Sequence, residues 1–372
     1  MSTARLAIIG TVGVPNVYGG FEALAENLVK DQRFDALVIC SSKNYSHRLK
    51  RFHSARLIYL PFSANGVSSV VYDIVSSIIA IALGYRNLLI LGVSGAIFFP
   101  FLRIFCPWTN LYVNVDGIEH QRQKFNRFAS LFLRLSEWFA VNCSHHIISD
   151  NLAVKKYLEV THNKKSTVIA YGGDHALGPP EARFLVTARN GDDASKLADI
   201  NNNYFFGISR IEPENNIHLI LEAFAESRFN LVFVGNWQYS EYGRQLSSKY
   251  GLLDWITLLD PVYDLSILYV LRSQSCGYIH GHSAGGTNPS LVEALFFQVP
   301  ILAFDCSYNK ATLQGTGLFF SDTVSLKQRT NLVNAGKVSI PDYSVLRRIY
   351  TWENICNKYF ELFCSMDDPC ND

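Results

Sequence analysis

The sequence predicts an α/β protein made of two Rossmann-like domains, each built on an open sheet, that face each other across a crevice. The chain has 372 residues, enough for two domains of ordinary size. Apolar strands alternate with amphipathic helices, as in layers of helices around parallel sheets. Residues 174–203, rich in Gly, Pro, Asp and Asn, interrupt this alternation. We therefore expect a first domain over 1–175, a linker over 176–200, a second domain over 201–343, and a C-terminal helix over 344–372 that could pack back on the first domain.

The composition is that of a soluble globular protein, with 48% hydrophobic and 17% charged residues. A formal net charge of +1 argues against a nucleic-acid partner, because nucleic-acid binders usually carry a strong basic excess. The eight cysteines include no C-x-x-C pair, which favours buried thiols in a reducing cytoplasm over disulfides or a zinc site. Residues 1–10 lack the apolar core of a signal peptide and lead directly into a strand. We expect a cytoplasmic protein.

The first domain begins with a strand over residues 5–10, a loop with several glycines, and a helix that starts near Gly20. Further strands are expected where short runs of apolar and β-branched residues lie between turn residues. These runs are residues 36–40, 56–60, 87–92, 111–117, 145–150 and 166–173. In open α/β sheets ligands bind beyond the carboxyl ends of the strands, so the loops after these strands are the places to look for a site.

One region of the first domain raises the question of a membrane. Between Asp73 and Leu102 the only charged residue is Arg86. Neither apolar run reaches the roughly 18–20 residues of a spanning helix, so we favour a buried helix followed by a buried strand, with contact to a membrane surface as the alternative. Residues 43–56 carry basic side chains and no acid, which fits either a solvated loop or a patch for anionic lipid headgroups. The basic residues are Lys43, Arg48, Lys50, Arg51 and Arg56.

The second domain repeats the alternation of strands and helices. Strands are expected over residues 204–209, 230–236, 256–260, 276–279 and 300–305. Helices are expected over residues 217–227, 241–250 and 264–274.

The stretch 277–295, GYIHGHSAGGTNPSLVEAL, joins a short strand to a helix through a glycine-rich loop. Proline is tolerated at the first helical position, so Asn288 before Pro289 is the expected N-cap. Free N–H groups and the positive end of the helix dipole suit an anion there, and Gly285 and Gly286 let a ligand approach the backbone closely. The stretch predicts either a phosphate site or a tight turn that packs without a ligand.

Three more strand ends carry candidate residues. The loop over residues 10–20 has Gly19 and Gly20 at the helix start but lacks the G-x-G-x-x-G of dinucleotide-binding proteins. Arg210 follows a strand, where its planar guanidinium could reach a diphosphate or form an ordinary surface ion pair. After the strand over 111–117 an acid, an imidazole and basic side chains lie within nine residues, which suggests an active site, although each alone is typical of a surface. These residues are Asp116, Glu119, His120, Arg122 and Lys124.

These segments resemble glycosyltransferase family 4, retaining enzymes of the GT-B fold. Residues 8–22 (IIGTVGVPNVYGGFE), residues 114–124 (NVDGIEHQRQK), and residues 210–216 (RIEPENN) with 281–295 (GHSAGGTNPSLVEAL) resemble its bacterial polysaccharide branch, which contains rhamnosyltransferases. The resemblance spans both domains in the same order.

The resemblance implies a role for each matching residue. Residues 19–20 would border the donor diphosphate and the acceptor, and Arg210 would pair with the diphosphate. Residues 286–287 and neighbouring amides would hold phosphate and sugar oxygens, and Glu293 would bind the ribose hydroxyls. The predicted catalytic residues are Asp116, Glu119, His120 and Arg210. The predicted donor-binding residues are Gly19, Gly20, Arg122, Lys124, Arg210, Asn215, His282, Gly285, Gly286, Thr287, Asn288 and Glu293.

The sequence departs from the family at three positions. Gly285 stands where the wider family has a glutamate, Asn215 where it has a lysine, and His120 where the branch usually has a tryptophan. His280 or His282 would make the sugar contact of the missing glutamate. Arg122 or Lys124 would supply the positive charge of the missing lysine.

The resemblance implies a retaining glycosyltransferase that moves a hexosyl or rhamnosyl unit from a nucleotide-diphosphate sugar, dTDP-rhamnose or UDP-glucose. The acceptor would be a lipid-diphosphate-linked saccharide of O-antigen or capsule synthesis, reached by peripheral association with the cytoplasmic face of the inner membrane. The leaving diphosphate would take the acceptor's proton, so neither a protein nucleophile nor a cofactor is expected. No metal is expected either, because no paired-aspartate site follows a strand. A sugar-nucleotide epimerase of the GT-B fold and a non-catalytic sugar-nucleotide-binding partner are the alternatives.

Overall fold

The computed structural model describes residues 3–16, 19–117, 127–178 and 203–364. The chain divides into two compact units. The first unit comprises Met1–Tyr171, Gly285–Thr287 and Trp352–Asp372, and the second comprises Gly172–Ala284 and Asn288–Thr351. The first unit is therefore assembled from three separate segments of the sequence.

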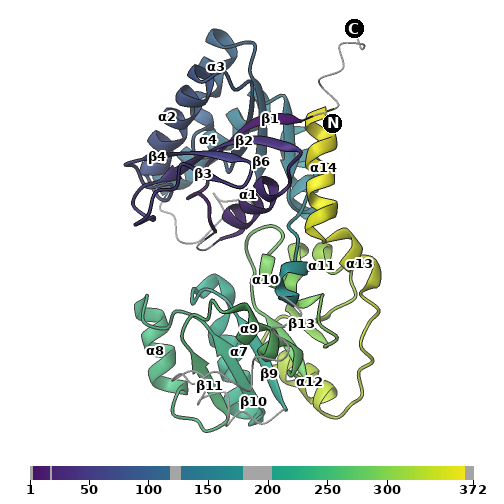
Figure 1. The fold of residues 1–372 in the computed structure, drawn as a ribbon. Coiled ribbons are helices and arrows are strands. Elements are labelled where there is room, and N and C mark those ends of the chain that lie inside the picture. The colour runs from purple at the N-terminus through teal and green to yellow at the C-terminus, as the bar shows by residue number, and fades with distance from the viewer. Residues whose placement is uncertain (1–2, 17–18, 118–126, 179–202, 365–372) are drawn as a thin grey trace. The chain divides into compact units, whose positions relative to one another are not determined.

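The first unit is built on an eight-stranded sheet of order β3-β4-β2-β1-β5-β6-β7-β8 (Figure 1). Neighbouring strands are parallel except β3 and β4, which form an antiparallel pair at one edge. The central strands are buried on both faces, which explains their nearly continuous apolar sequences. The strands are β1 (Ala4–Ile9), β2 (Phe34–Ser41), β3 (Arg51–Phe52), β4 (Ala55–Leu60), β5 (Asn87–Leu91), β6 (Asn110–Val115), β7 (His146–Ser149) and β8 (Thr167–Val168).

Helices cover both faces of this sheet (Figure 1). Helix α1 joins β1 to β2, whereas α2 joins β4 to β5 in the opposite direction across the sheet. Right-handed crossovers therefore place α1 on one face and α2, α3 and α4 on the other. The helices are α1 (Gly20–Lys30), α2 (Ser68–Ala82), the 3-10 helix η1 (Ala96–Phe98), α3 (Phe99–Phe105), α4 (Arg127–Cys143), α5 (Leu152–His162) and α14 (Trp352–Cys364).

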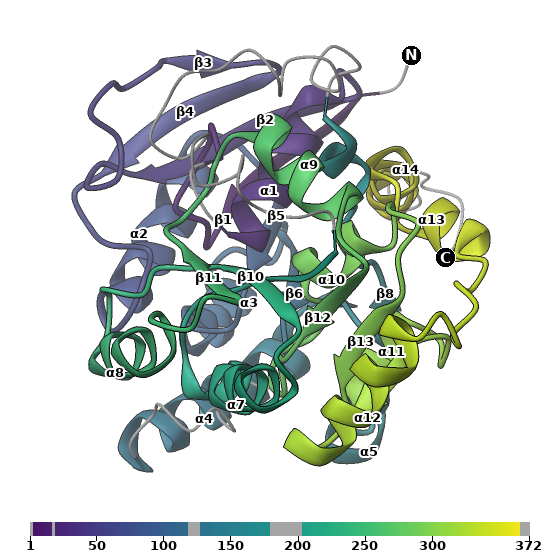
Figure 2. The ribbon, with the colours of Figure 1, turned by 90° about the horizontal axis from the view of Figure 1, so that it is seen from below.

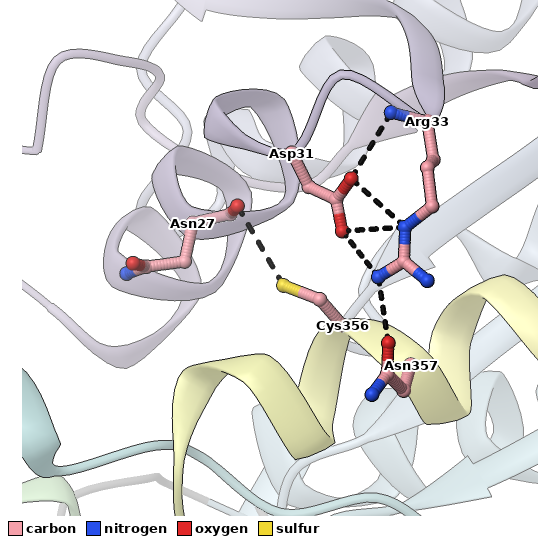
Figure 3. Close-up of polar contacts among 5 residues, drawn as sticks. All are labelled: Asn27, Asp31, Arg33, Cys356 and Asn357. Carbon is pink, nitrogen blue, oxygen red and sulfur yellow. Dashed lines mark hydrogen bonds and ion pairs between the residues drawn. The ribbon is translucent and has the colours of Figure 1, made fainter.

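The predicted single helix over residues 344–372 is wrong, because two helices occupy this region up to residue 364. The first, α13 (Ser344–Ile349), ends where the carbonyl of Tyr350 accepts a hydrogen bond from Gly173 N–H instead of continuing the helix. The second, α14, belongs to the first unit and packs on α1 and β1. Arg33 Nη2 donates to Asn357 Oδ1 at 2.7 Å while its guanidinium also pairs with Asp31 (Figure 3).

The second unit has a six-stranded parallel sheet of order β11-β10-β9-β12-β13-β14. This is the 3-2-1-4-5-6 order of a Rossmann sheet, with the order reversing between β9 and β12. Its core packs α7 and α8 on the sheet, and α12 lies beside α7 (Figure 2). The strands are β9 (Tyr204–Ile208), β10 (Asn230–Val234), β11 (Ile256–Leu259), β12 (Gly277–His280), β13 (Ile301–Phe304) and β14 (Leu318–Phe320). The helices are the 3-10 helices η3 (Asp174–Leu177) and η6 (Pro213–Asn215), with α7 (Ile217–Ser227), α8 (Glu241–Tyr250), α9 (Leu265–Ser273), α10 (Pro289–Ala294), α11 (Ser307–Thr312) and α12 (Thr323–Asn334).

The apolar region over residues 73–102 is only partly the buried structure that was expected. Strand β5 is buried, but α2 exposes Val71 and Ile78 to solvent while Tyr72 and Ala80 face the sheet. Among the described residues no helix combines the length and the apolar character needed to cross a bilayer. The expectation of a buried helix was therefore wrong. The sequence did not reveal the exposed face, because that face of α2 carries apolar and not polar residues.

Candidate functional site

Two aspartates meet at the carboxyl edge of the first sheet. Asp116 follows β6 and Asp150 follows β7, and these strands are parallel neighbours. Asp150 is fully buried. Burial, and then the charge of Asp116, raise the pKa of Asp150 well above its ordinary value. The raised pKa favours the protonated form of Asp150 at this edge.

The glycine-rich loop contacts Asp150 directly, and residues 285–287 of this loop belong to the first unit. Thr287 N–H donates to Asp150 Oδ2 at 2.6 Å, and Thr287 Oγ1 donates to the Asp150 carbonyl at 2.5 Å. A Cβ on Gly286 would overlap the Asp150 carboxylate, and a Cβ on Gly117 would overlap the backbone of Gly285. Packing alone thus requires glycine at 117 and 286. For the loop at 286 this agrees with the alternative prediction of a tight turn that packs without a ligand. Donor binding by Gly285, Gly286 and Thr287 stays a prediction.

The loop after β1 is folded around a buried glutamate on α1. Glu22 accepts hydrogen bonds from Thr11 Oγ1 at 3.0 Å and from Val12 N–H at 2.8 Å. Burial raises the pKa of Glu22, and these hydrogen bonds offset the rise only in part. Gly19 has a φ of 129°, and a Cβ there would overlap the Glu22 carboxylate. As predicted, α1 begins at Gly20, and glycine at position 19 is needed to close the loop over Glu22.

In the second unit the loops after β9 and β12 are joined at one edge of the sheet. The two strands are parallel neighbours, so their carboxyl ends lie together. Asn216 Nδ2 donates to the Gly281 carbonyl at 2.9 Å, and Ser283 N–H donates to the Glu214 carbonyl at 3.0 Å. The order of the sheet reverses between these strands, which is the place where open α/β sheets bind ligands.

Arg210 stands at this edge, two residues beyond the end of β9. Its side chain is 42% exposed, and Nη1 lies 3.6 Å from Glu212 Oε1. The arrangement satisfies both hypotheses for Arg210, a weak surface ion pair and a guanidinium open to an anion. Asn215 is buried and its Nδ2 donates to the Arg210 carbonyl at 2.7 Å, so it fixes the backbone that carries the arginine.

The segment from β12 to α10 places Asn288 as expected but shortens the helix. Asn288 Oδ1 accepts from Ser290 N–H at 3.1 Å, which confirms the N-cap, whereas α10 ends at Ala294. Before the loop, the rings of His280 and His282 stack with centroids 4.4 Å apart. Burial lowers the pKa of His280 to about 3, so this imidazole is neutral at physiological pH. Both histidines are buried, and sugar contact by either stays a prediction.

Glu293 on α10 is held by two basic side chains of the second unit. Its carboxylate pairs with the buried guanidinium of Arg272 on α9 and lies 3.2 Å from His175 Nε2 in η3. Burial alone would raise the pKa of Glu293, but Arg272 and His175 together hold it below its ordinary value. Glu293 is therefore an ionised, fixed acceptor, as binding of ribose hydroxyls would require. That role remains a prediction.

Four of the predicted site residues, Glu119, His120, Arg122 and Lys124, lie outside the described residues. Of the predicted residues that are described, Asp116 lies beside Asp150 in the first unit, and the loop that carries Arg210 is hydrogen-bonded to Gly281 in the second. Among the described residues no group of three or more His, Cys, Asp or Glu side chains could hold a metal ion.

Sequence reasoning missed three residues that organise these edges, namely Glu22, Asp150 and Arg272. Asp150 could have been found, because it follows an apolar strand in the same way as Asp116. Glu22 lies inside a segment already singled out, and an acid in the first turn of a helix is a common signal. Arg272 gave no signal, since a basic residue in the last turn of an amphipathic helix is ordinary.

Two family models match the chain. Residues 3–174 match a model described as "Domain of unknown function (DUF1972)", and residues 189–321 match one described as "Glycosyl transferases group 1". No curated protein matches the chain in sequence at a significant level.

Solved structures show the same fold over nearly the whole chain. Sucrose-phosphate synthase from Thermosynechococcus elongatus is 15% identical with a TM-score of 0.78, covering 98% of this chain and 99% of that one. HepE from Anabaena, in complex with UDP and glucose, is 15% identical with a TM-score of 0.70, covering 98% and 100%. α,α-Trehalose 6-phosphate synthase from Burkholderia multivorans is 11% identical with a TM-score of 0.73, covering 98% and 99%.

The predicted fold class is thereby confirmed: the chain has the GT-B fold, with two Rossmann-like parallel-sheet units. Together with the match of residues 189–321, this fold supports a glycosyltransferase.

Proposed function

We propose that the protein is a retaining glycosyltransferase of family 4 that moves a hexosyl or rhamnosyl unit from a nucleotide-diphosphate sugar to a lipid-diphosphate-linked saccharide. The observation that carries the proposal is the edge of the second sheet where the loops after β9 and β12 are hydrogen-bonded together beside Arg210. This edge lies within the segment that matches the group 1 glycosyl transferases. HepE, which shares the fold, was solved with UDP and glucose.

In this proposal each described residue has a distinct task. Arg210 offsets the charge that grows on the diphosphate as the sugar leaves, and such preorganised charge is typically the largest catalytic contribution. Glu293, kept ionised by Arg272, accepts hydrogen bonds from the ribose hydroxyls of the donor. The departing diphosphate takes the proton of the acceptor hydroxyl, so the protein supplies no nucleophile. Asp116 holds that hydroxyl in position for attack.

The acceptor part of the proposal concerns O-antigen or capsule synthesis at the cytoplasmic face of the inner membrane. Association would be peripheral. The basic side chains of residues 43–56 are exposed at the β3 edge of the first sheet, where anionic headgroups can reach them. The expected donor is dTDP-rhamnose, with UDP-glucose as the alternative.

The test is product analysis by mass spectrometry, with a panel of dTDP- and UDP-sugars and undecaprenyl-diphosphate-linked saccharides. We expect one donor to add one sugar to the lipid-linked acceptor, with the donor's anomeric configuration retained in the product by NMR. A changed sugar nucleotide formed without acceptor would instead identify an epimerase. Saturable donor binding with no new product under any condition would identify a non-catalytic binding partner. Inversion at the anomeric carbon would exclude family 4.

A further inference from the structure

Helix α3 of the first unit presents apolar side chains to solvent instead of polar ones. Phe101, Ile104 and Phe105 lie at the spacing i, i+3 and i+4 on α3, Trp108 lies in the turn after the helix, and each is more than half exposed. The opposite side of the helix packs inward through Phe99 and Leu102. A surface helix of a globular protein normally turns its polar residues outward. The exposed apolar side of α3 therefore suggests that this side contacts a second apolar environment.

Helix α4 repeats this arrangement. Phe128, Leu131, Leu135 and Trp138 lie at the spacing i, i+3, i+7 and i+10 and are all exposed, whereas Leu133, Ala140 and Val141 on the other side are buried. Helices α3 and α4 contact each other and cover the same face of the sheet (Figure 1). The eight exposed side chains of these two helices and of the turn after α3 are here called the α3–α4 face. An apolar surface of this kind marks an interaction site.

The exposed charged side chains of α3 and α4 are all basic. Arg103 on α3 and Arg127 and Arg134 on α4 are exposed among the apolar side chains. Over residues 64–117 and 127–143 the acids are Asp73, Asp116 and Glu137.

None of these acids offsets the arginines at the surface. Asp73 and Glu137 are buried, and Asp116 stands half-buried at the carboxyl end of β6. Glu137 Oε1 instead accepts from Tyr157 Oη at 2.7 Å and lies 2.9 Å from His162 Nε2. The α3–α4 face thus combines large apolar side chains, two tryptophans among them, with three exposed arginines that no acid of the described residues 64–117 and 127–143 offsets at the surface.

We propose that the α3–α4 face is the surface by which the first unit lies on an anionic lipid bilayer. This inference deepens the peripheral membrane association in the proposed function and rests on it. Apolar side chains of an interfacial helix enter the boundary between headgroups and acyl chains, while arginines reach the anionic headgroups. Tryptophan is enriched at this depth of a membrane.

The charge pattern favours a bilayer over a second copy of the chain. A two-fold dimer joins the same patch on both subunits, so it would bring two copies of Arg103, Arg127 and Arg134 into one interface with no exposed acid of α3 or α4 to pair with them. Like charges brought together at an interface oppose association. Arg134 and Trp138 also line a cavity of about 260 Å³ with Tyr157 and His162, which offers a headgroup a recess at the edge of this face.

The experiment measures sedimentation of the purified full chain with vesicles of phosphatidylcholine alone or with three parts in ten of phosphatidylglycerol. One variant carries Phe101→Ser, Ile104→Ser, Phe105→Ser and Trp108→Ser, and a second carries Arg103→Glu, Arg127→Glu and Arg134→Glu. The matched control carries Tyr239→Ser, Leu252→Ser and Val324→Ser, which are exposed apolar residues of the second unit. All substituted side chains are exposed, so the melting temperatures are expected to stay near the parent's.

The parent and the control should bind the anionic vesicles equally and bind neutral vesicles weakly. The arginine variant should lose at least about 10²-fold in partition, since each basic residue near an anionic surface contributes about fivefold and the three glutamates are also repelled by the headgroups. The apolar variant should lose at least about tenfold and should stay weak at low salt. Equal partition of the parent and both variants would overturn the assignment of this face. The assignment would also be overturned if the parent were a dimer and the apolar variant a monomer while both bound the vesicles equally. Transfer to a water-soluble acceptor, measured in parallel, tests the proposed chemistry separately, because it needs no bilayer.

Discussion

Replacing Arg272 with methionine should destabilise the second unit locally around α9 and β12. The guanidinium is buried and pairs with Glu293, so the substitution leaves a carboxylate in a largely enclosed place. Removing one partner of a buried pair costs about 3–5 kcal/mol. We take the lower end, about 3 kcal/mol, because His175 remains beside the carboxylate. At 1.36 kcal/mol per factor of ten, this raises the population of the opened state on the order of 10²-fold.

Amide hydrogen exchange read peptide by peptide is the suitable assay, because a chain of two units need not unfold in a single step. Peptides from α9 and β12 in Arg272→Met should exchange on the order of 10²-fold faster than in the parent, while peptides from the first sheet should not change. The control is Arg244→Met, which removes an exposed i,i+3 pair with Glu241 in the same unit. An exposed pair contributes little to stability, so exchange there should change by a few-fold at most.

The double variant Arg272→Met/Glu293→Leu separates a lost ion pair from lost packing. With both charges gone no unpaired charge is left, so protection of β12 should return most of the way to the parent's. If Arg272→Met exchanges like the parent, or if the double variant is as unprotected as the single one, the electrostatic account of this pair is wrong. Donor binding by Glu293 would then lose its structural support as well.

Three further predictions concern the chemistry. Arg210→Ala should lower kcat by about 10²-fold and change the donor KM less, and steady-state kinetics in which KM alone rises would show that Arg210 only binds the donor. Asp150→Asn keeps an acceptor for Thr287 N–H but removes a carboxyl group with a raised pKa. The parent's stabilisation by protonated Asp150 is complete below the ordinary carboxyl pKa and is lost as the pH rises through the raised one. The melting temperature of Asp150→Asn should therefore rise relative to that of the parent as the pH goes from 4 to 8. Parallel curves of melting temperature against pH would contradict the raised pKa of Asp150. Exhaustive chelation should leave the initial rate unchanged, and recovery of a lost rate by Mg²⁺ or Mn²⁺ would show that a metal is needed.

The sheets were largely predictable because buried parallel strands leave continuous apolar runs in the sequence. The runs at 87–92 and 230–236 became β5 and β10 with little change of bounds. The two-residue strand β3 and the edge strand β14 were not predicted, because neither is long enough to show the alternation of apolar and polar residues. The break between α13 and α14 was missed for another reason. It depends on a hydrogen bond from Gly173, far away in the sequence, to the Tyr350 carbonyl.

The site was predictable to the extent that it depends on strand ends. Arg210, Asp116 and Asn288 stand where the alternation of strands and helices placed them. What the sequence could not show is which groups already have partners within the protein. Thr287 N–H is bonded to Asp150, and Glu293 to Arg272, and both contacts depend on tertiary packing.

The return of α14 to the first unit affects how the protein is made on the ribosome. Tyr359 and Phe363 are buried in that unit, where Phe363 meets the rings of Phe34 and Tyr112. Domains of nascent chains usually fold in the order of synthesis. Here the first unit to be translated still lacks a helix of its core while the whole second unit emerges. A ribosome that stalls before codon 352 would therefore release a chain with an open apolar face on its earliest-made sheet, a substrate for chaperones and proteases.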